Sequence, residues 1–153
     1  VAFILSIIVL FTLTAYYLGA ILVEGEGWAY LIDTGLLFVG TFVAGMLLVF
    51  TYTSIGLALS SVSSGKFFPA VAFIGIILGT KLVSFLISSL FGSSAIYLVS
   101  PYDCLAHVGQ WILGLNYTYD HPPSWSLVML LMMNAVSLYV LSVRVSSLEV
   151  TRE

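Results

Sequence analysis

The sequence predicts an all-α membrane protein: a polytopic bundle of about four transmembrane helices, with short interfacial or re-entrant helices before the last. Hydrophobic residues make up 61% of the chain and charged residues 7%, whereas a soluble domain carries roughly 25% charged residues. The apolar residues also form runs of about 20 or more, the length that a helix needs to cross roughly 30 Å of hydrocarbon. We therefore expect residues 1–153 to form a single transmembrane domain in contact with the lipid bilayer.

The first two predicted spans flank a short polar stretch. The first span covers residues 1 to about 23 and contains no charged residue. Because the chain begins at Val1, already inside this apolar run, we expect it to be the C-terminal part of a longer protein. Residues 24–28 are expected to form a surface loop. The second span covers about residues 34–61, and Asp33 is expected at the N-cap or in the first turn of its helix, where the helix dipole favours an anion.

The third and fourth predicted spans cover about residues 67–91 and 124–143. Pro69 lies in the first turn of the third span, where its missing N–H costs little. Gly75 and Gly79 have the G-x-x-x-G spacing of helices that approach each other closely in membranes. We therefore expect this face of the third span to be a contact surface, either for another helix of the chain or for a second copy.

The segment Gly92–Ser124 is too polar for a further span. Its apolar stretches, residues 95–99 and 105–115, are too short to cross a bilayer. Ser100-Pro-Tyr-Asp103 has the pattern of a helix start, with Pro101 at the first helical position. We expect one or two short helices that lie in the membrane interface or dip into it.

The basic residues predict the orientation. Lys66 follows the second span, and Arg144 and Arg152 follow the last, so all three lie on one side of the membrane. The positive-inside rule makes that side the cytoplasm, in a prokaryotic plasma membrane. The polar tail from Arg144 is then cytoplasmic. Cys104, the single cysteine, is expected outside or near the outer surface.

Lys81 is the most informative polar residue, because it lies near the middle of the third span. An ammonium group at the bilayer centre costs about 2.5–3.5 kcal/mol and usually faces a cavity, a neighbouring helix or an anionic partner. The partners expected for Lys81 are carbonyls at a broken helix end, Asp103 or a second subunit. The plainer alternative is that Lys81 snorkels along a tilted helix.

Asp103 and His107 are spaced i, i+4 and would share one face of a helix. Together with Lys81 they are the candidate intramembrane or translocation-path residues. A metal needs three or four converging ligands, and His121 is distant in sequence, so a capped interfacial helix is the better interpretation. We predict no catalytic, cofactor or metal site.

Two motif absences limit the function. The sequence has neither the phosphate-binding loop of an ATPase nor the G-x-S-x-G of a serine hydrolase. It also has no basic patch that would bind nucleic acid. The chain is therefore not expected to be an enzyme.

Three features carry a resemblance to a known family. They are the turn from Gly56 to Lys66 (GLALSSVSSGK) between two long spans, the semi-polar segment before the last span, and the short tail from Arg144. In these the chain resembles the type-2 permease family, the membrane subunits of ABC exporters, over the last four of six spans. It departs from the family in having one basic residue in the turn and in lacking the coupling helix that contacts the ATPase.

The resemblance implies a transmembrane permease subunit of an ATP-driven exporter. Such a subunit forms the translocation path as a homodimer or heterodimer with a separate cytoplasmic ATPase, which alone binds ATP. The alternative is a non-transporting membrane anchor or assembly subunit, for which the charge of Lys81 would be unnecessary. A membrane enzyme ranks third, because only Asp103 and His107 approach a cluster of catalytic side chains.

Overall fold

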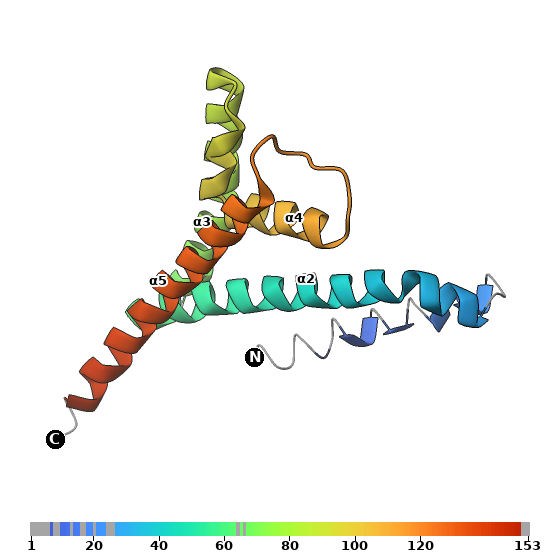
Figure 1. The fold of residues 1–153 in the computed structure, drawn as a ribbon. Helices are drawn as coiled ribbons and strands as arrows, with labels where there is room; N and C mark the ends of the chain where they lie inside the picture. Colours follow the sequence, from blue (N-terminus) through green and yellow to red (C-terminus); the bar gives the residue numbers. More distant parts are fainter. Residues whose placement is uncertain are drawn as a thin grey trace.

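The computed structural model describes residues 7, 10–12, 14–15, 18–19, 21–23, 27–63, 65 and 67–150. For residues 27–34 and 148–150 it describes the backbone alone. The elements in order are α2 (Gly27–Val62), α3 (Phe68–Phe91), the 3-10 helix η1 (Ser94–Val99), α4 (Pro101–Ile112) and α5 (Pro123–Val150), drawn in Figure 1. No strand occurs among these residues, so the predicted all-α class is confirmed.

Three helices in the described part are long and apolar enough to cross a membrane. They are Gly35–Val62, Phe68–Phe91 and Pro123–Ser147, of 28, 24 and 25 residues. Even the shortest would extend about 36 Å, more than the roughly 30 Å of the hydrocarbon core. They match the second, third and fourth predicted spans, and the protein is an all-α membrane protein. The predicted first span, residues 1 to 23, lies largely outside the described residues.

The start of α2 corrects one expectation. The helix begins at Gly27, so the predicted loop ends before Trp28. Asp33 lies inside the helix and is neither its N-cap nor in its first turn. The residues from Trp28 to Ile32 are apolar or aromatic and include no proline or glycine that would end a helix. The helix therefore starts before the hydrophobic span itself.

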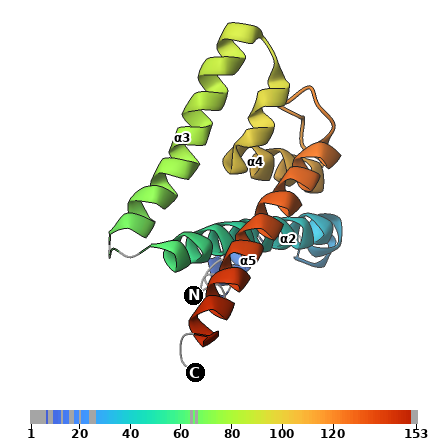
Figure 2. The ribbon, with the colours of Figure 1, turned by 90° about the vertical axis from the view of Figure 1, so that its left-hand side faces the viewer.

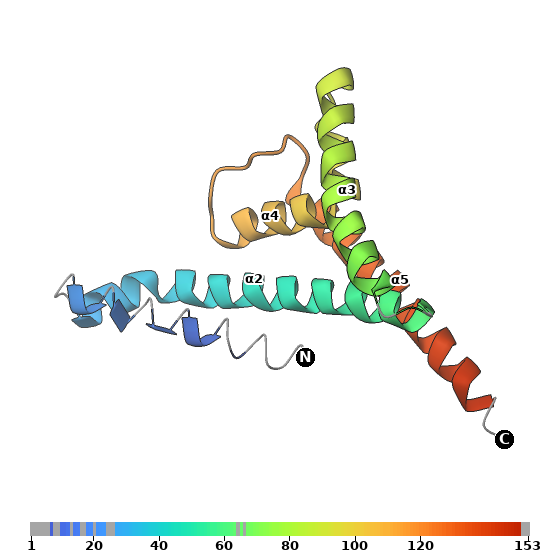
Figure 3. The same cartoon turned by 180° about the vertical axis from the view of Figure 1, so that it is seen from behind.

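The three long helices are splayed. Figures 1 and 3 show α2 crossing the middle of α5 and ending where α3 begins. Near this turn the Tyr52 ring of α2 meets the Phe73 ring of α3 edge-on, with centroids 5.9 Å apart. Helix α3 then departs from α2, and in the described part of the chain no Cα atom of α3 lies within 8 Å of one in α5.

The glycine pair of α3 does not form the predicted contact. A Cβ added at Gly75 or Gly79 would meet nothing within 4 Å. The G-x-x-x-G prediction is therefore wrong for contacts within the described part of this chain. Close approach occurs instead at Gly40 of α2, where an added Cβ would lie 3.2 Å from the Ile112 side chain of α4.

After α3 the chain turns back on itself. Gly92 adopts a left-handed conformation with φ 66° and closes the helix. Figure 2 shows the chain descending from there through η1 to α4. Ser100 caps α4 by accepting a hydrogen bond from the Asp103 backbone N–H, and Pro101 occupies the first turn. The 12 residues of α4 extend about 18 Å, so the prediction of short helices before the last span is confirmed.

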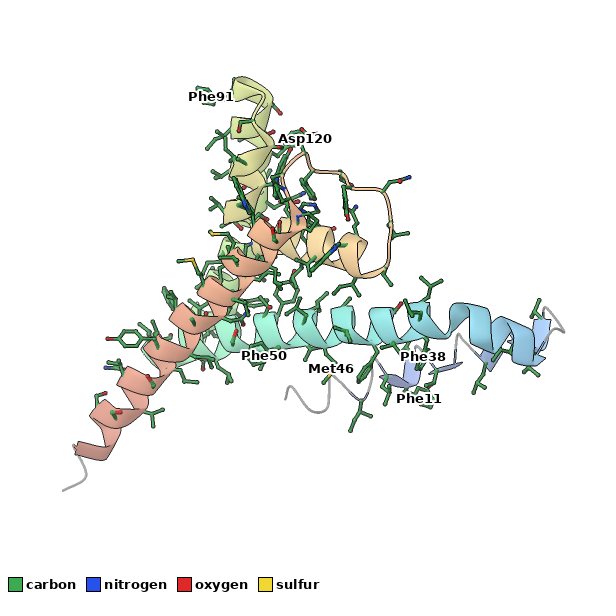
Figure 4. All side chains as sticks on the ribbon, viewed as in Figure 1. Phe11, Phe38, Met46, Phe50, Phe91 and Asp120 are labelled. Atoms are coloured by element: carbon green, nitrogen blue, oxygen red, sulfur yellow. The ribbon has the colours of Figure 1, made fainter. Side chains whose placement is uncertain are left out.

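The core is small and lies beneath α4. It contains Cys104, Leu105 and Val108 of α4 packed against Leu130 of α5. Most large apolar side chains elsewhere are exposed, as expected where lipid is the solvent. Figure 4 shows Met46 and Phe50 pointing from α2 away from α4.

Helices α2 and α5 are also joined by a buried polar cluster. Asn134 of α5 accepts a hydrogen bond from the Ser54 hydroxyl and donates one to the Thr51 hydroxyl at 3.1 Å. All three residues are buried. In a membrane such bonds replace the hydrophobic effect as a specific link between helices.

Replacing Asn134 with leucine should lower the free energy of unfolding by about 1 kcal/mol, within the range measured for hydrogen bonds between membrane helices. The change removes both links between the helices and leaves the Thr51 hydroxyl without this partner. Unfolding in mixed detergent and SDS micelles measures the effect. Ser142→Leu, on an exposed face of the same helix, is the matched control, and equal losses in the two variants would contradict the prediction.

The far end of α5 lies beside the end of α2. Arg144 donates from Nε to the Ser61 carbonyl at 3.2 Å. The start of the tail and the α2–α3 turn therefore lie at the same end of the molecule, as the sequence predicted. Helix α5 continues through the tail to Val150, whereas Lys66 and Arg152 lie outside the described residues.

Candidate functional site

The ammonium group of Lys81 pairs with the carboxylate of Asp103. The ion pair joins Lys81 Nζ to Asp103 Oδ1, with the Lys81 side chain 39% exposed and that of Asp103 1% exposed. Lys81 lies ten residues before the end of α3, or about 15 Å along the helix. The descent through η1 brings α4 back to this level. Of the three partners expected for Lys81, the structure provides Asp103.

Aromatic residues surround the pair. The Lys81 Nζ atom lies 5.6 Å from the ring centroid of Tyr97 and 5.1 Å from that of Tyr102, within the range of a cation–π interaction. The Tyr119 hydroxyl donates to Asp103 Oδ1 at 2.6 Å. Burial, together with this bond to the carboxylate, raises the pKa of Tyr119 and keeps its phenol protonated. Asp103 Oδ2 has no hydrogen-bond partner in the described part of the chain.

His107 belongs to a second cluster beside the ion pair. Its Nδ1 lies 3.2 Å from His121 Nε2 and 2.9 Å from Ser126 Oγ, and His121 Nε2 is 3.0 Å from the same hydroxyl. Asp103 and His107 are both buried on one face of α4, as their spacing predicted. His107 nevertheless bonds to the residues after α4 and not to Asp103.

These contacts fold the loop of residues 113–122 onto α4. Gln110 holds Thr118 through two hydrogen bonds, one from its amide to the hydroxyl at 2.7 Å and one from the Thr118 N–H at 3.2 Å. Tyr119 and His121 supply the other links. Asp120, at the top of the loop in Figure 4, is exposed. Sequence reasoning missed Tyr119, His121 and Ser126, although the run of tyrosines and a histidine before Pro122 was a signal.

The two histidines should make the loop sensitive to acid. Burial lowers the pKa of both rings below the ordinary 6.5. The neighbouring His121 ring lowers the pKa of His107 further, while the charge of Asp120 partly offsets the effect of burial on the pKa of His121. The unfolded chain then takes up protons below about pH 6.5 that the folded chain does not, so stability is present above that pH and declines below it. Charging one ring also places an imidazolium beside the other imidazole.

The measurement is detergent unfolding and amide exchange of residues 113–122, at about pH 7.5 and about pH 5.5. Stability and protection should fall at the lower pH, and His121→Gln should reduce this dependence because it removes one titrating ring. If residues 113–122 of the wild-type protein are equally protected from amide exchange at the two pH values, the assignment of His107 and His121 as neutral is contradicted.

The histidine pair does not complete a metal site. Two imidazole nitrogens converge there, whereas a structural zinc site takes four ligands and a catalytic one three. The part of the chain that the structure describes contains no group of three His, Cys, Asp or Glu side chains suited to a metal ion. The third atom of the cluster is the Ser126 hydroxyl, so the arrangement is a hydrogen-bonded network.

An apolar groove lies between α3 and α5. Its volume is about 380 Å³. Its lining comes from all five elements: Ile55 of α2, Ile76 and Thr80 of α3, Val99 of η1, Pro101 of α4, and Met129, Met132, Met133, Val136 and Ser137 of α5. The candidate site thus combines a paired charge within the membrane region with an apolar groove next to it.

Comparison of the chain with models of known protein families, with curated proteins and with solved structures finds no match. The site must therefore be interpreted from its own geometry. It can hold a charge inside a membrane protein at low cost, fasten the spanning helix α3 to the short helix α4, and accommodate an apolar molecule beside them.

Proposed function

We propose that this chain is a transmembrane permease subunit of an ATP-driven, ABC-type exporter. It forms the translocation path as a dimer and works with a separate cytoplasmic ATPase. The proposal places it in the cell membrane, with the α2–α3 turn and the C-terminal tail in the cytoplasm. The observation that carries the proposal is the Lys81–Asp103 pair, which joins a spanning helix to the re-entrant segment.

The ion pair supports transport because of what it connects. In the described part of the chain the backbone of α3 stays more than 8 Å from that of α5, and α3 is joined to α4 and η1 by packing and by this pair. An element held in this way can move as a rigid body when the pair opens or shifts. Motions of one bundle against another are how transporters expose a central site alternately to the two sides.

The groove and the turned-back segment support the same function. The α3–η1–α4–α5 arrangement has the order of elements expected from the resemblance: a span, short outer helices and a last span. The groove supplies space within the spanning region. Energy must come from another protein, because the sequence contains no phosphate-binding loop.

One observation favours the alternative, a non-transporting anchor or assembly subunit. Lys81 and Asp103 neutralise each other. In a non-transporting subunit the pair would have a structural role, which is to fix the position of α4. The two functions differ in their partners and in their response to ATP. An anchor would need no ATPase, and its ion pair would affect assembly alone.

The test is to purify the full-length protein together with any ATPase encoded beside it. We expect a complex with two copies of the permease, and ATP hydrolysis that changes on reconstitution into membranes. The same ATPase with its phosphate-binding lysine replaced is the control for coupling. A protein that is monomeric and binds no ATPase would contradict the proposal and favour the anchor.

A further inference from the structure

We propose that Asp103, Tyr97 and Tyr102 form a binding site for the ammonium group of an organic amine, and that Lys81 occupies this site as a tethered cation until such a ligand exchanges with it. The binding follows from the contacts of Lys81 and does not depend on the proposed function. The identification of the amine as an exported molecule does rest on that function.

The contacts of Lys81 show which ligand chemistry the site accepts, because an alkylammonium group already lies in it. The Lys81 Nζ atom pairs with the Asp103 carboxylate and lies 5.6 Å and 5.1 Å from the ring centroids of Tyr97 and Tyr102. A carboxylate beside two aromatic rings suits an organic ammonium ion, since the rings attract the cation and also contact its alkyl groups. Ca²⁺ or Mg²⁺ would instead need about six oxygen ligands, and aromatic carbon atoms supply none.

The receptor side of this contact is built apart from α3. All three residues of the site belong to η1 and α4, whereas the cation comes from α3. The Ser100 hydroxyl accepts a hydrogen bond from the Asp103 backbone N–H at 3.3 Å, and the Tyr119 hydroxyl donates to the carboxylate at 2.6 Å. The Tyr119 ring also packs against the Tyr97 ring, with centroids 5.2 Å apart. These contacts position the carboxylate and one ring without the lysine, so the site is preorganised for a free cation as well.

The two members of the ion pair differ in their freedom to move. The Lys81 side chain is 39% exposed, whereas that of Asp103 is 1% exposed. The lysine can therefore withdraw while the carboxylate stays buried, and a buried carboxylate without a counter-charge is costly. An incoming ammonium group removes this cost. A primary ammonium has three donors, and Asp103 Oδ2 has no hydrogen-bond partner among the described residues, so a free ligand can use both carboxylate oxygens.

A purely structural ion pair makes a different demand on the lysine. In that role the ammonium group must be attached to α3, because the pair serves to hold α3 against α4. In a binding site, any ammonium group that fits satisfies the carboxylate, whether attached or free. A variant in which the group is removed from α3 and supplied in solution separates the two roles.

The first experiment uses the full-length Lys81→Ala variant with n-propylammonium chloride, because the substitution removes a propylammonium group from the side chain. We expect propylammonium to bind the folded variant and stabilise it. At ten times its dissociation constant, it should raise the ratio of folded to unfolded protein about tenfold. Unfolding in mixed detergent and SDS micelles measures this ratio, with NaCl replacing the amine at equal ionic strength in the reference samples.

Matched controls separate the charge from the volume of the ligand. n-Propanol has a similar size without the charge and should not stabilise Lys81→Ala. Propylammonium should not stabilise the double variant Lys81→Ala, Asp103→Asn, and Tyr102→Leu added to Lys81→Ala should weaken its binding about threefold, the effect of one cation–π interaction. No stabilisation by propylammonium, or equal stabilisation by propanol or in the double variant, would overturn the proposal.

The second experiment measures exchange with the lysine present, so it does not depend on the folding of Lys81→Ala. In a Lys66→Arg background Lys81 is the remaining lysine of the chain, and mass spectrometry follows its acylation by a succinimidyl ester. N,N-dimethylpropylamine, a tertiary amine that the ester does not acylate, should displace Lys81 and accelerate its acylation to a plateau. Acylation at the same rate with the amine as with NaCl would show that the lysine does not yield, which overturns the proposal.

Neither experiment needs ATP or an ATPase. Their failure would therefore refute the ammonium site alone, whereas failure to isolate a complex with an ATPase would refute only the exporter.

Discussion

Replacing Lys81 alone with methionine should destabilise the protein by about 3 kcal/mol, at the lower end of the loss when one partner of a buried ion pair is removed. Methionine keeps the length of the side chain but leaves the Asp103 carboxylate, 1% exposed, without its counter-charge. The loss should not be larger, because Lys81 is partly exposed and the Tyr119 hydroxyl still donates to Asp103. Unfolding in mixed detergent and SDS micelles measures it.

The double variant Lys81→Met, Asp103→Asn should recover most of that loss, since it removes both charges at once. A double-mutant cycle gives the coupling energy directly. Asp120→Asn is the control, because it removes an exposed carboxylate outside the pair. If the loss of stability in the double variant equals the sum of the losses in Lys81→Met and Asp103→Asn, a direct interaction is contradicted. If the pair serves transport, the double variant should fold and insert but export poorly.

Cys104 should react with a maleimide about 1,000-fold more slowly in the folded protein than an exposed cysteine does, because the reaction needs the thiolate. The sequence suggested an accessible position, but Cys104 is 1% exposed and lies in the core under α4. Burial, and secondarily the charge of Asp103, raises the pKa of its thiol from 9.0 to about 12. Labelling in native membranes and after denaturation in SDS measures the ratio.

Asn116→Cys in a Cys104→Ser background is the matched control, because residue 116 is exposed on the loop of residues 113–122. It should react quickly, and on intact cells an impermeant maleimide should reach it if the loop faces outward. Fast labelling of Cys104 in the native protein would contradict its burial. Labelling of the residue-116 variant only in opened cells would reverse the predicted orientation.

The sequence predicted the features that depend on composition along the chain. Hydropathy located three spanning helices because crossing the membrane fixes both their length and their lack of charge. Pro101, Ser100 and the i, i+4 spacing located α4 and its polar face because helix starts depend on local residues. The cost of a charge in lipid required a partner for Lys81, and Asp103 was one of three candidates.

Features that depend on packing could not be predicted in this way. His121 and Tyr119 reach α4 only because the loop folds back, and a pattern of hydropathy contains no information about that fold. Asn134 has no charge, so its bonds to α2 gave no signal in the sequence. The G-x-x-x-G spacing on α3 marks a smooth surface but does not determine whether another helix lies against it.

The attachment of α3 has a consequence for how the protein responds to its membrane. The helix is joined to α2 near one end and to η1 and α4 towards the other, while the described part of α5 stays more than 8 Å from it between Cα atoms. Its length of about 36 Å exceeds the hydrocarbon thickness of an average bilayer, and a helix with such a mismatch tilts. A thinner bilayer should increase the tilt of α3 and so change its separation from α5. The thickness of the host membrane, and with it the length of its acyl chains, would then set how far the methionine-lined groove opens.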